Sequence, residues 1–139
     1  MITGLKLRVV TPSGPVVELE ADAITACSEL GEFCVLPEHR PILAALKPGR
    51  FIVEVNGETR IYATDVGFFE GGADHVNVMT QHCVSKQSLA DKVADLETER
   101  ASLAESLGRL EEDSPARSTL ESGLTWVDAQ LAVVRESAL

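Results

Sequence analysis

The hydrophobic period of this sequence changes near residue 86. Before it, short apolar runs alternate with turn residues, and after it leucine and valine recur at intervals of three and four. Five of the six prolines lie in the first 48 residues, and eight of the ten glycines lie in the first 72. A period of two is typical of strands and a period near 3.6 of helices. We therefore predict a β domain over residues 1–86 and a helical domain over residues 87–139.

The β domain has strong turn signals between its apolar runs. Asn56-Gly57 lies between "FIVEV" and "ETRIYA", and both residues tolerate the positive φ that a two-residue hairpin requires. Nine or ten such runs precede residue 86. This many short strands need two packed layers, so we predict a β-sandwich.

The helical domain contains two apolar seams with coiled-coil spacing. The first seam is Leu89, Val93, Leu96, Arg100, Leu103, Leu107 and Leu110, and the second is Leu120, Leu124, Val127, Leu131 and Val134. Between them, Ser114 is a suitable N-cap and Pro115 a suitable first helical residue. The short connection predicts an antiparallel helical hairpin.

Both predicted helices also carry a further stripe that the hairpin itself does not need. The second helix has a second apolar stripe, Trp126, Ala129 and Val133. The first helix has a stripe of small residues: Ala90, Ala94, Ala101, Ala104 and Gly108. The partner of these stripes is either the chain's own sandwich or another protein.

Charge and hydropathy exclude several classes of function. The net charge of −10 argues against nucleic-acid binding and against adsorption to an anionic membrane. The longest apolar blocks, such as residues 41–46, are far shorter than the roughly 20 residues of a membrane-spanning helix. The start "MITGLKLRVV" has neither a signal-peptide nor a transit-peptide pattern. We therefore expect no membrane insertion, and a cytoplasm-like compartment.

The sequence contains no recognisable catalytic motif. It lacks a glycine-rich phosphate loop, a nucleophile elbow and a zinc-protease helix, and the spacings of Cys34, His39, His82 and Cys83 match no zinc pattern. His39 stands between two prolines in "PEHRP", where a stiff turn could display a base or form a contact surface. We predict no catalytic residue, cofactor or metal. Cys27 and Cys34 could face each other across a hairpin, and in a reducing compartment they would act as small hydrophobic residues.

Three segments resemble one family over Leu5 to Val84. "GEFCVLPEHRPILAALKPG" resembles the segment G-E-x-G-I-L-P-x-H-A-P-L-x-x-x-L-x-P-G of the epsilon subunit of F-type ATP synthases, which is called delta in mitochondria. "ATDVGFFEGGADHVNVMT" is similar to the family's G-G-F-x-E-V…V-T-V-L segment, and "LKLRVVTPSGPVVELEADAI" to its opening strands. The resemblance implies a ten-stranded β-sandwich followed by a C-terminal antiparallel two-helix hairpin.

The same resemblance implies a non-catalytic subunit of the rotating central stalk, which links the gamma subunit to the c-ring and couples proton or sodium flow to ATP synthesis. It implies a peripheral position on the cytoplasmic face of a bacterial plasma membrane, or on the stromal face of a thylakoid. By position, it assigns Gly31, Glu32 and Phe33 to the c-ring contact, and His39, Pro41 and Ile42 to the gamma contact. These two contact surfaces are expected on one edge of the sandwich. Two readings compete with this one: a ligand-binding β-sandwich with a helical oligomerisation hairpin, and a small enzyme that uses His39.

The chain departs from the family pattern at several positions. Cys34 and Glu38 stand where the family usually has glycine, and Arg40 where it has alanine. In some members the helices contact the alpha and beta subunits and block ATP hydrolysis, or bind ATP through an I/L-D-x-x-R-A motif. Here "LADKVA" at residues 89–94 is taken as the nearest stretch and lacks the arginine, and residues 87–139 carry eleven acidic and five basic side chains. We therefore predict no nucleotide binding by the hairpin, and inhibition of hydrolysis that is weak or acts through apolar contacts.

Overall fold

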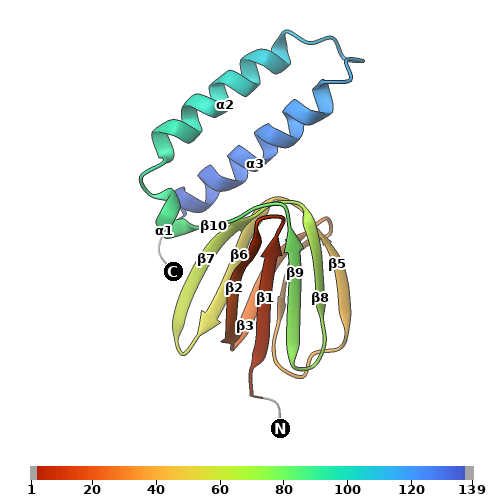
Figure 1. Cartoon of the computed structure of the whole chain (residues 1–139), viewed down its shortest axis with the longest axis vertical. Helices are drawn as coiled ribbons and strands as arrows, with labels where there is room; N and C mark the ends of the chain where they lie inside the picture. The colour runs from red at the N-terminus through yellow and green to blue at the C-terminus, as the bar shows by residue number, and fades with distance from the viewer. Residues whose placement is uncertain (1–2, 137–139) are drawn as a thin grey trace.

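The computed structural model describes residues 3–136, which form ten strands followed by three helices (Figure 1). The strands are β1 (Leu5–Thr11), β2 (Gly14–Ala21), β3 (Ala23–Ser28), β4 (Gly31–Val35), β5 (Ile42–Leu46), β6 (Gly49–Val55), β7 (Glu58–Thr64), β8 (Gly67–Gly71), β9 (His75–Thr80) and β10 (Cys83–Ser85). The helices are α1 (Lys86–Leu89), α2 (Val93–Gly108) and α3 (Arg117–Arg135).

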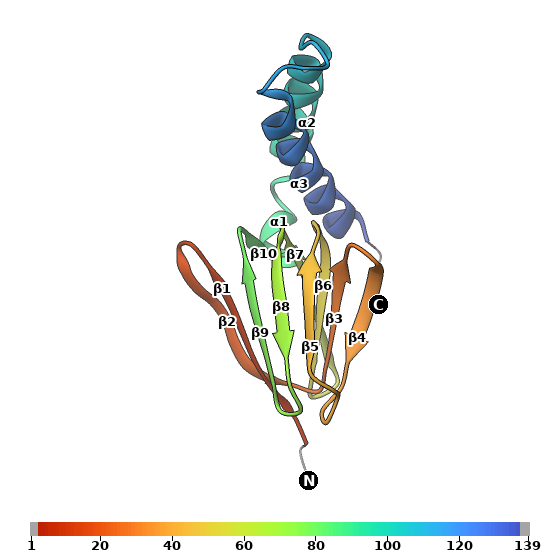
Figure 2. The same ribbon diagram turned by 90° about the vertical axis from the view of Figure 1, so that its right-hand side faces the viewer.

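The ten strands belong to one hydrogen-bonded sheet that folds over into two layers. Its order is β10-β7-β6-β3-β5-β8-β9-β1-β2, and β4 pairs only with β3. Neighbouring strands are antiparallel except β1 and β9, which are parallel. Figure 2 shows the two ends of the sandwich, with the hairpin standing on one of them. The predicted ten-stranded sandwich followed by a helical hairpin is confirmed.

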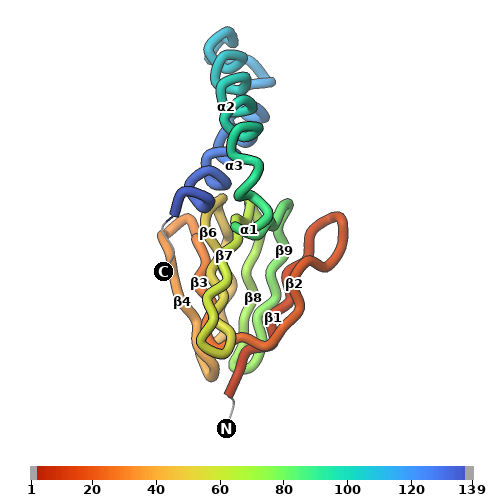
Figure 3. The backbone as a smooth tube through the Cα atoms, turned by 90° about the vertical axis from the view of Figure 1, so that its left-hand side faces the viewer, coloured from red at the N-terminus to blue at the C-terminus, as the bar shows by residue number. Residues whose placement is uncertain are grey.

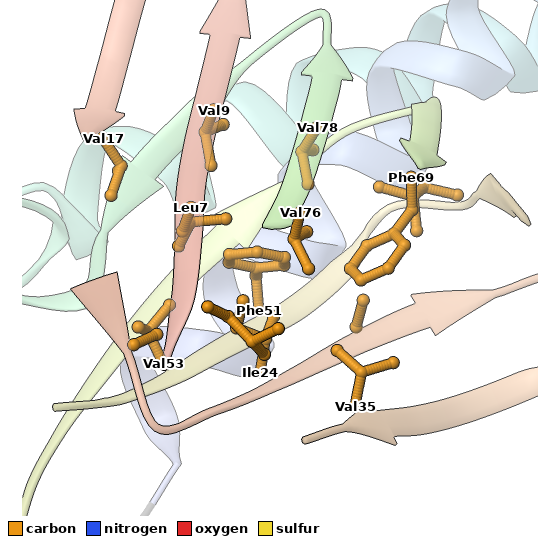
Figure 4. Packing of buried hydrophobic residues seen from close by; sticks show 14 residues of the cluster. Leu7, Val9, Val17, Ile24, Val35, Phe51, Val53, Phe69, Val76 and Val78 are labelled. Carbon is orange, nitrogen blue, oxygen red and sulfur yellow. The ribbon is translucent and has the colours of Figure 1, made fainter. Parts of the chain in front are cut away.

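The core follows from the alternation in the sequence. Leu5 and Leu7 of β1 are buried while the intervening Lys6 is exposed, as the period of two requires. Phe51 and Phe69 come from opposite layers and are fully buried (Figure 4). Burial of these aliphatic and aromatic side chains is the main stabilising term of the sandwich.

The predicted hairpin turn is present between β6 and β7. Asn56 has a φ of 52° and Gly57 a φ of 80°, which are the positive values that such a turn needs. The backbone N–H of Asn56 also donates to the Asp22 carboxylate at 2.8 Å, so the turn is anchored to the neighbouring chain segment.

The hairpin departs from the sequence prediction at both helix starts. The first helix is interrupted after Leu89 and resumes at Val93, so the predicted continuous seam begins in the separate helix α1. The prediction that Ser114 caps the second helix is wrong, because α3 begins at Arg117 with Ala116 at its N-cap. The Ser114 carbonyl instead accepts a hydrogen bond from the Arg117 N–H at 3.1 Å, which closes a turn before the helix.

A second hydrophobic cluster joins the hairpin to the sandwich. α2 and α3 run antiparallel side by side, and the last turns of α3 lie over β6 and β7 (Figures 1 and 3). The buried members of this hairpin cluster are Ala63, Leu89, Leu96, Val127, Leu131 and Val133. Ala63 is the member that comes from a sandwich strand, so the cluster lies on the outer face of β7.

Candidate functional site

The two contact surfaces predicted from the sequence lie along β4, at opposite ends of it. β4 pairs only with β3 and is therefore an edge strand. Gly31 begins β4 at the end of the sandwich that carries the hairpin, whereas the turn with His39 lies at the other end (Figures 2 and 3). At that other end, the N–H of Glu38 donates to the carbonyl of Ala73 in the β8–β9 connection. The two surfaces share an edge but face opposite ends of the molecule.

The β3–β4 connection displays an apolar tip. Ser28 Oγ donates to the Gly31 carbonyl at 2.8 Å and accepts from the Leu30 N–H at 3.2 Å. Gly31 has a φ of 118°, which favours glycine. This geometry leaves Leu30 fully exposed, at 100% of its surface. Sequence reasoning missed Leu30, although an apolar residue directly before a turn glycine was a readable signal.

The three residues predicted to meet the c-ring differ in what they present. Phe33 points inward, with its ring centroid 4.9 Å from that of Phe69 in an edge-to-face arrangement. Glu32 points outward and accepts hydrogen bonds from Arg50, which holds the pKa of its carboxyl below the ordinary value. Gly31 shapes the turn, so Glu32 and the adjacent Leu30 are the side chains that a partner would meet.

The His39 side chain is held in place within its turn by a hydrogen bond and by packing. Its Nδ1 lies 2.7 Å from the Arg40 carbonyl, which can only accept, so Nδ1 carries the proton. Its Nε2 is buried and has no hydrogen-bond partner among residues 3–136. The ring lies against Gly71, where an added Cβ would be 2.9 Å from His39 Cε1. Because the basic nitrogen is out of contact with solvent, this geometry does not suit a general base.

The remaining residues of this turn divide between surface and core. Glu38 has a φ of 70°, in the left-handed region that favours glycine, which is the residue that the family usually has there. Pro41 is exposed, whereas Ile42 packs against the sandwich core. Of the three residues predicted to meet gamma, Pro41 offers an exposed side chain.

A broader apolar surface lies on the outer face of β5, β8 and β9. Leu43, Phe68 and Met79 are 74%, 55% and 62% exposed. Ala45, Phe68, Met79 and Val10 are successive register partners, so they form a row across four strands. We call Leu43 and this row the outer apolar face. Contiguous apolar surface of this kind marks interaction sites on soluble proteins.

Sequence reasoning missed the outer apolar face because it read each strand for one buried side. "ILAAL" and "GFFEG" are apolar at consecutive positions, so both faces of these strands carry apolar side chains. Phe69 points into the core and its neighbour Phe68 points out. Consecutive apolar residues in a strand with only one core-facing side were the available signal.

The second apolar stripe of α3 faces the sandwich. Ala129 and Val133 are buried, and the Trp126 ring stacks on His82 with centroids 5.3 Å apart and an interplanar angle of 18°. His82 Nδ1 lies 2.8 Å from the Asp65 carboxylate, so the stacked imidazole is held from the sandwich side. The small-residue stripe of the first helix, in contrast, is exposed at Ala90, Ala94, Ala101, Ala104 and Gly108.

Two ion pairs bridge the helices of the hairpin. Arg100 Nε lies 2.5 Å from Asp128, and Arg135 Nη2 lies 2.5 Å from Glu97. The assignment of "LADKVA" as the nearest stretch is wrong, because "LETERA", residues 96–101, fits the I/L-D-x-x-R-A pattern better, with Glu97 in the place of the aspartate. Both arginines are already paired with carboxylates, so a phosphate would have to displace an acidic side chain to reach them.

The cysteines and histidines of the β domain do not gather. Cys27 is the register partner of Glu32 and Cys34 that of Thr25, so the two cysteines do not face each other. Within residues 3–136, no group of three or more His, Cys, Asp or Glu side chains is placed to hold a metal ion. In the same residues, none of the helices has the length and apolar character needed to cross a membrane.

Comparison with known proteins gives a consistent set of relatives. Residues 4–86 match the family described as "ATP synthase, Delta/Epsilon chain, beta-sandwich domain". The chain is 35% identical over 131 residues to the ATP synthase epsilon chain of Geobacter sp. (strain M21), covering 94% of this chain and 88% of the relative. It is 31% identical over 97 residues to that of Bacillus subtilis (strain 168), covering 70% and 74%.

Solved structures share the same fold. A chain in the Euglena gracilis mitochondrial ATP synthase, solved as OSCP/F1/c-ring, superposes with a TM-score of 0.75 at 23% identity and covers 97% of this chain and 84% of that one. A chain in the Tetrahymena thermophila mitochondrial ATP synthase central stalk and c-ring gives a TM-score of 0.60 at 12% identity, covering 94% and 96%. The family match over most of the sandwich and the epsilon-chain relatives together show that this chain belongs to the delta/epsilon family of non-catalytic ATP synthase subunits.

Proposed function

We propose that this chain is the central-stalk subunit that joins the gamma subunit to the c-ring and so couples proton or sodium flow to ATP synthesis. The outer apolar face carries this proposal, because Leu43, Phe68 and Met79 are large apolar side chains with most of their surface in solvent. A rotor subunit must hold its neighbour firmly through many turns, and a central apolar patch with a polar rim is the usual form of such an interface.

The gamma subunit is the proposed partner of the outer apolar face. The turn at His39 and Pro41 directly precedes the start of β5 and extends the same region, while Ile42 supports it from the core. In this arrangement His39 fixes the shape of the turn and Pro41 meets the partner. The contact is therefore broader than the three residues predicted from the sequence.

The c-ring is the proposed partner of the β3–β4 connection. The exposed Leu30 gives this loop an apolar tip, and Glu32 places a carboxylate beside it. Because this loop and the His39 turn lie at opposite ends of the sandwich, the subunit can contact two neighbours without either contact blocking the other. The proposed location is peripheral, at the cytoplasmic face of a bacterial plasma membrane, as suits a subunit whose relatives named above include bacterial epsilon chains.

A binding experiment tests the gamma contact. Phe68→Glu places a charge at the centre of the outer apolar face, and Thr59→Glu adds the same charge to β7 in the other layer, where the residue is already exposed. We expect Phe68→Glu to abolish co-purification with gamma while Thr59→Glu retains it. Equal retention by both variants would refute this surface as the gamma contact.

The hairpin, residues 87–139, is proposed as a separate regulatory domain that inhibits ATP hydrolysis weakly. Its eleven acidic and five basic side chains disfavour contact with an acidic surface of the catalytic subunits. We expect the removal of residues 87–139 from a reconstituted complex to change the rate of ATP hydrolysis by less than about twofold, because contacts between solvent-exposed charges are weak. A several-fold rise would contradict the charge argument.

The alternative function, a ligand-binding sandwich, has less support. Phe51 and Phe69 fill the core between the layers, and Phe33 packs edge-on against Phe69. Three of the four phenylalanines are therefore committed to the interior and cannot line a ligand pocket.

A further inference from the structure

Arg50 on β6 holds two separate parts of the molecule at once. Its Nε and Nη2 donate to the Glu32 carboxylate on β4, with Nη2 2.9 Å from Oε1. Its Nη1 donates to the carboxylate of Glu136, the residue that follows α3. The Nζ of Lys86 donates to the backbone carbonyl of the same Glu136. One guanidinium therefore connects the loop at the end of the sandwich to the end of the hairpin.

These three side chains lie at the margin of the interface between hairpin and sandwich. The side chains of Arg50, Glu32 and Glu136 are 35%, 37% and 19% exposed, so they are partly shielded from water. Arg50 is the register partner of Ala63, which is fully buried in the hairpin cluster. The hydrogen bonds from Arg50 lower the pKa of Glu32, and those carboxylates raise the pKa of Arg50. The ionised forms are thus the ones that this arrangement favours.

Glu32 and Glu136 compete for one cation. Two carboxylates on the same guanidinium repel each other, and Arg50 offsets that repulsion. If a cationic group of a partner pairs with Glu32, the repulsion between Glu32 and Glu136 falls, and Arg50 is free to bind Glu136 alone. The end of the hairpin is then held more tightly. If Arg50 is removed, Glu136 loses its cation while Glu32 remains near it, and the end of the hairpin is released.

We propose that Arg50 couples occupancy of the β3–β4 loop to docking of the hairpin: neutralising Glu32 tightens the hairpin and removing Arg50 loosens it. The coupling is a property of the chain alone, and it rests on the proposed function only for the identity of the partner at Glu32, the c-ring. A half-exposed ion pair changes an equilibrium by about two- to fivefold.

A double-mutant cycle in the full chain tests this coupling. Glu32→Gln mimics neutralisation by a partner, and Glu136→Gln removes the hairpin's share of Arg50. Hairpin opening is measured by hydrogen exchange of residues 124–135 and by acrylamide quenching of Trp126, which is the single tryptophan of the chain. We expect Glu136→Gln and Arg50→Gln to raise exchange about two- to fivefold, and Glu32→Gln to slow it.

The decisive comparison is the effect of Glu32→Gln in two backgrounds. We expect it to slow exchange when Glu136 is present and to have no effect in Glu136→Gln. The same effect in both backgrounds, or faster exchange in Glu32→Gln, would overturn the proposal. Glu18→Gln is the matched control, since Glu18 pairs with Arg8 at 3.1 Å between β1 and β2, and it should leave exchange in the hairpin unchanged.

The outcome is separable from the test of the proposed function. Additive effects of Glu32→Gln and Glu136→Gln would refute the coupling while complex formation with gamma stays intact. Failure of the unmodified chain to bind gamma would refute the proposed function, whereas the result of the double-mutant cycle in the isolated chain would be unaffected.

Discussion

Replacing Leu131 by alanine removes one of the buried side chains on which the hairpin depends. Leu131 of α3 is 3% exposed and lies in the hairpin cluster together with Leu96 of α2 and Ala63 of β7. The substitution deletes three carbon groups, which at about 0.8 kcal/mol for each buried methylene amounts to roughly 2.4 kcal/mol. The cavity left behind raises the cost, so we expect a loss of about 3 kcal/mol.

This loss should fall on the hairpin and spare the sandwich. The hairpin cluster is distinct from the sandwich core, and helices such as α2, with 16 residues, and α3, with 19, owe most of their stability in a protein to tertiary packing. Each part carries one reporter, because the single tryptophan is Trp126 on α3 and the single tyrosine is Tyr62 on β7.

Urea titration followed by both reporters measures the effect. In Leu131→Ala we expect the Trp126 transition to move to lower urea by the equivalent of about 3 kcal/mol and the Tyr62 transition to stay in place. Leu43→Ala is the matched control, because the same substitution at a side chain that is 74% exposed should cost little. A shift below about 1 kcal/mol, or an equal shift of both transitions, would show that Leu131 does not stabilise the hairpin as a separate unit.

Three further predictions use other parts of the sandwich and hairpin. Gly67→Ala should destabilise the chain by about 1–3 kcal/mol, because the added Cβ would lie 1.9 Å from a backbone oxygen of β9. Gly108→Ala meets nothing within 4 Å and should stabilise the chain by up to about 1 kcal/mol. Thermal unfolding of the two variants checks the sign of each change in stability. Hydrogen bonds to the carboxylates of Glu70 and Asp74 raise the pKa of His75, so these bonds stabilise the fold fully below the unfolded pKa, near 6.5, and this stabilisation is lost as the pH rises through the raised pKa. An NMR titration should show that Glu70→Gln lowers the pKa of His75, and an unchanged midpoint would contradict the assignment. Burial raises the pKa of Cys83 to about 12, so it should resist iodoacetamide at pH 8 until the chain unfolds, and rapid labelling of the native chain would disprove this.

The sequence allowed the sandwich and the hairpin to be predicted because their signals are local. Asn56-Gly57 specifies its own turn, and the seam through Leu124, Val127 and Leu131 specifies a helix face. The start of α3 could not be predicted in the same way. Ser114 and Pro115 have the right chemistry for a cap, but the Ser114 carbonyl accepts a hydrogen bond from the Arg117 N–H and closes a turn before the helix starts.

The candidate site was less accessible to sequence reasoning than the fold. Resemblance located the loop at Gly31 and the turn at His39, but the positions of these segments at opposite ends of β4 come from the way the sheet folds. The outer apolar face is assembled from β5, β8, β9 and β1, which are neighbours only in the sheet order. Likewise, Arg50 meets a residue 86 positions away, a separation at which no local spacing rule applies.

Native mass spectrometry of the full chain mixed with a gamma subunit, combined with hydrogen exchange, tests directly whether this chain joins the central stalk through its outer apolar face. If the outer apolar face binds gamma, we expect a stable one-to-one complex in which exchange slows in β5, β8 and β9, the strands that carry Leu43, Phe68 and Met79. A chain that stays free under gentle conditions, or a complex that leaves exchange in these three strands unchanged, would contradict it.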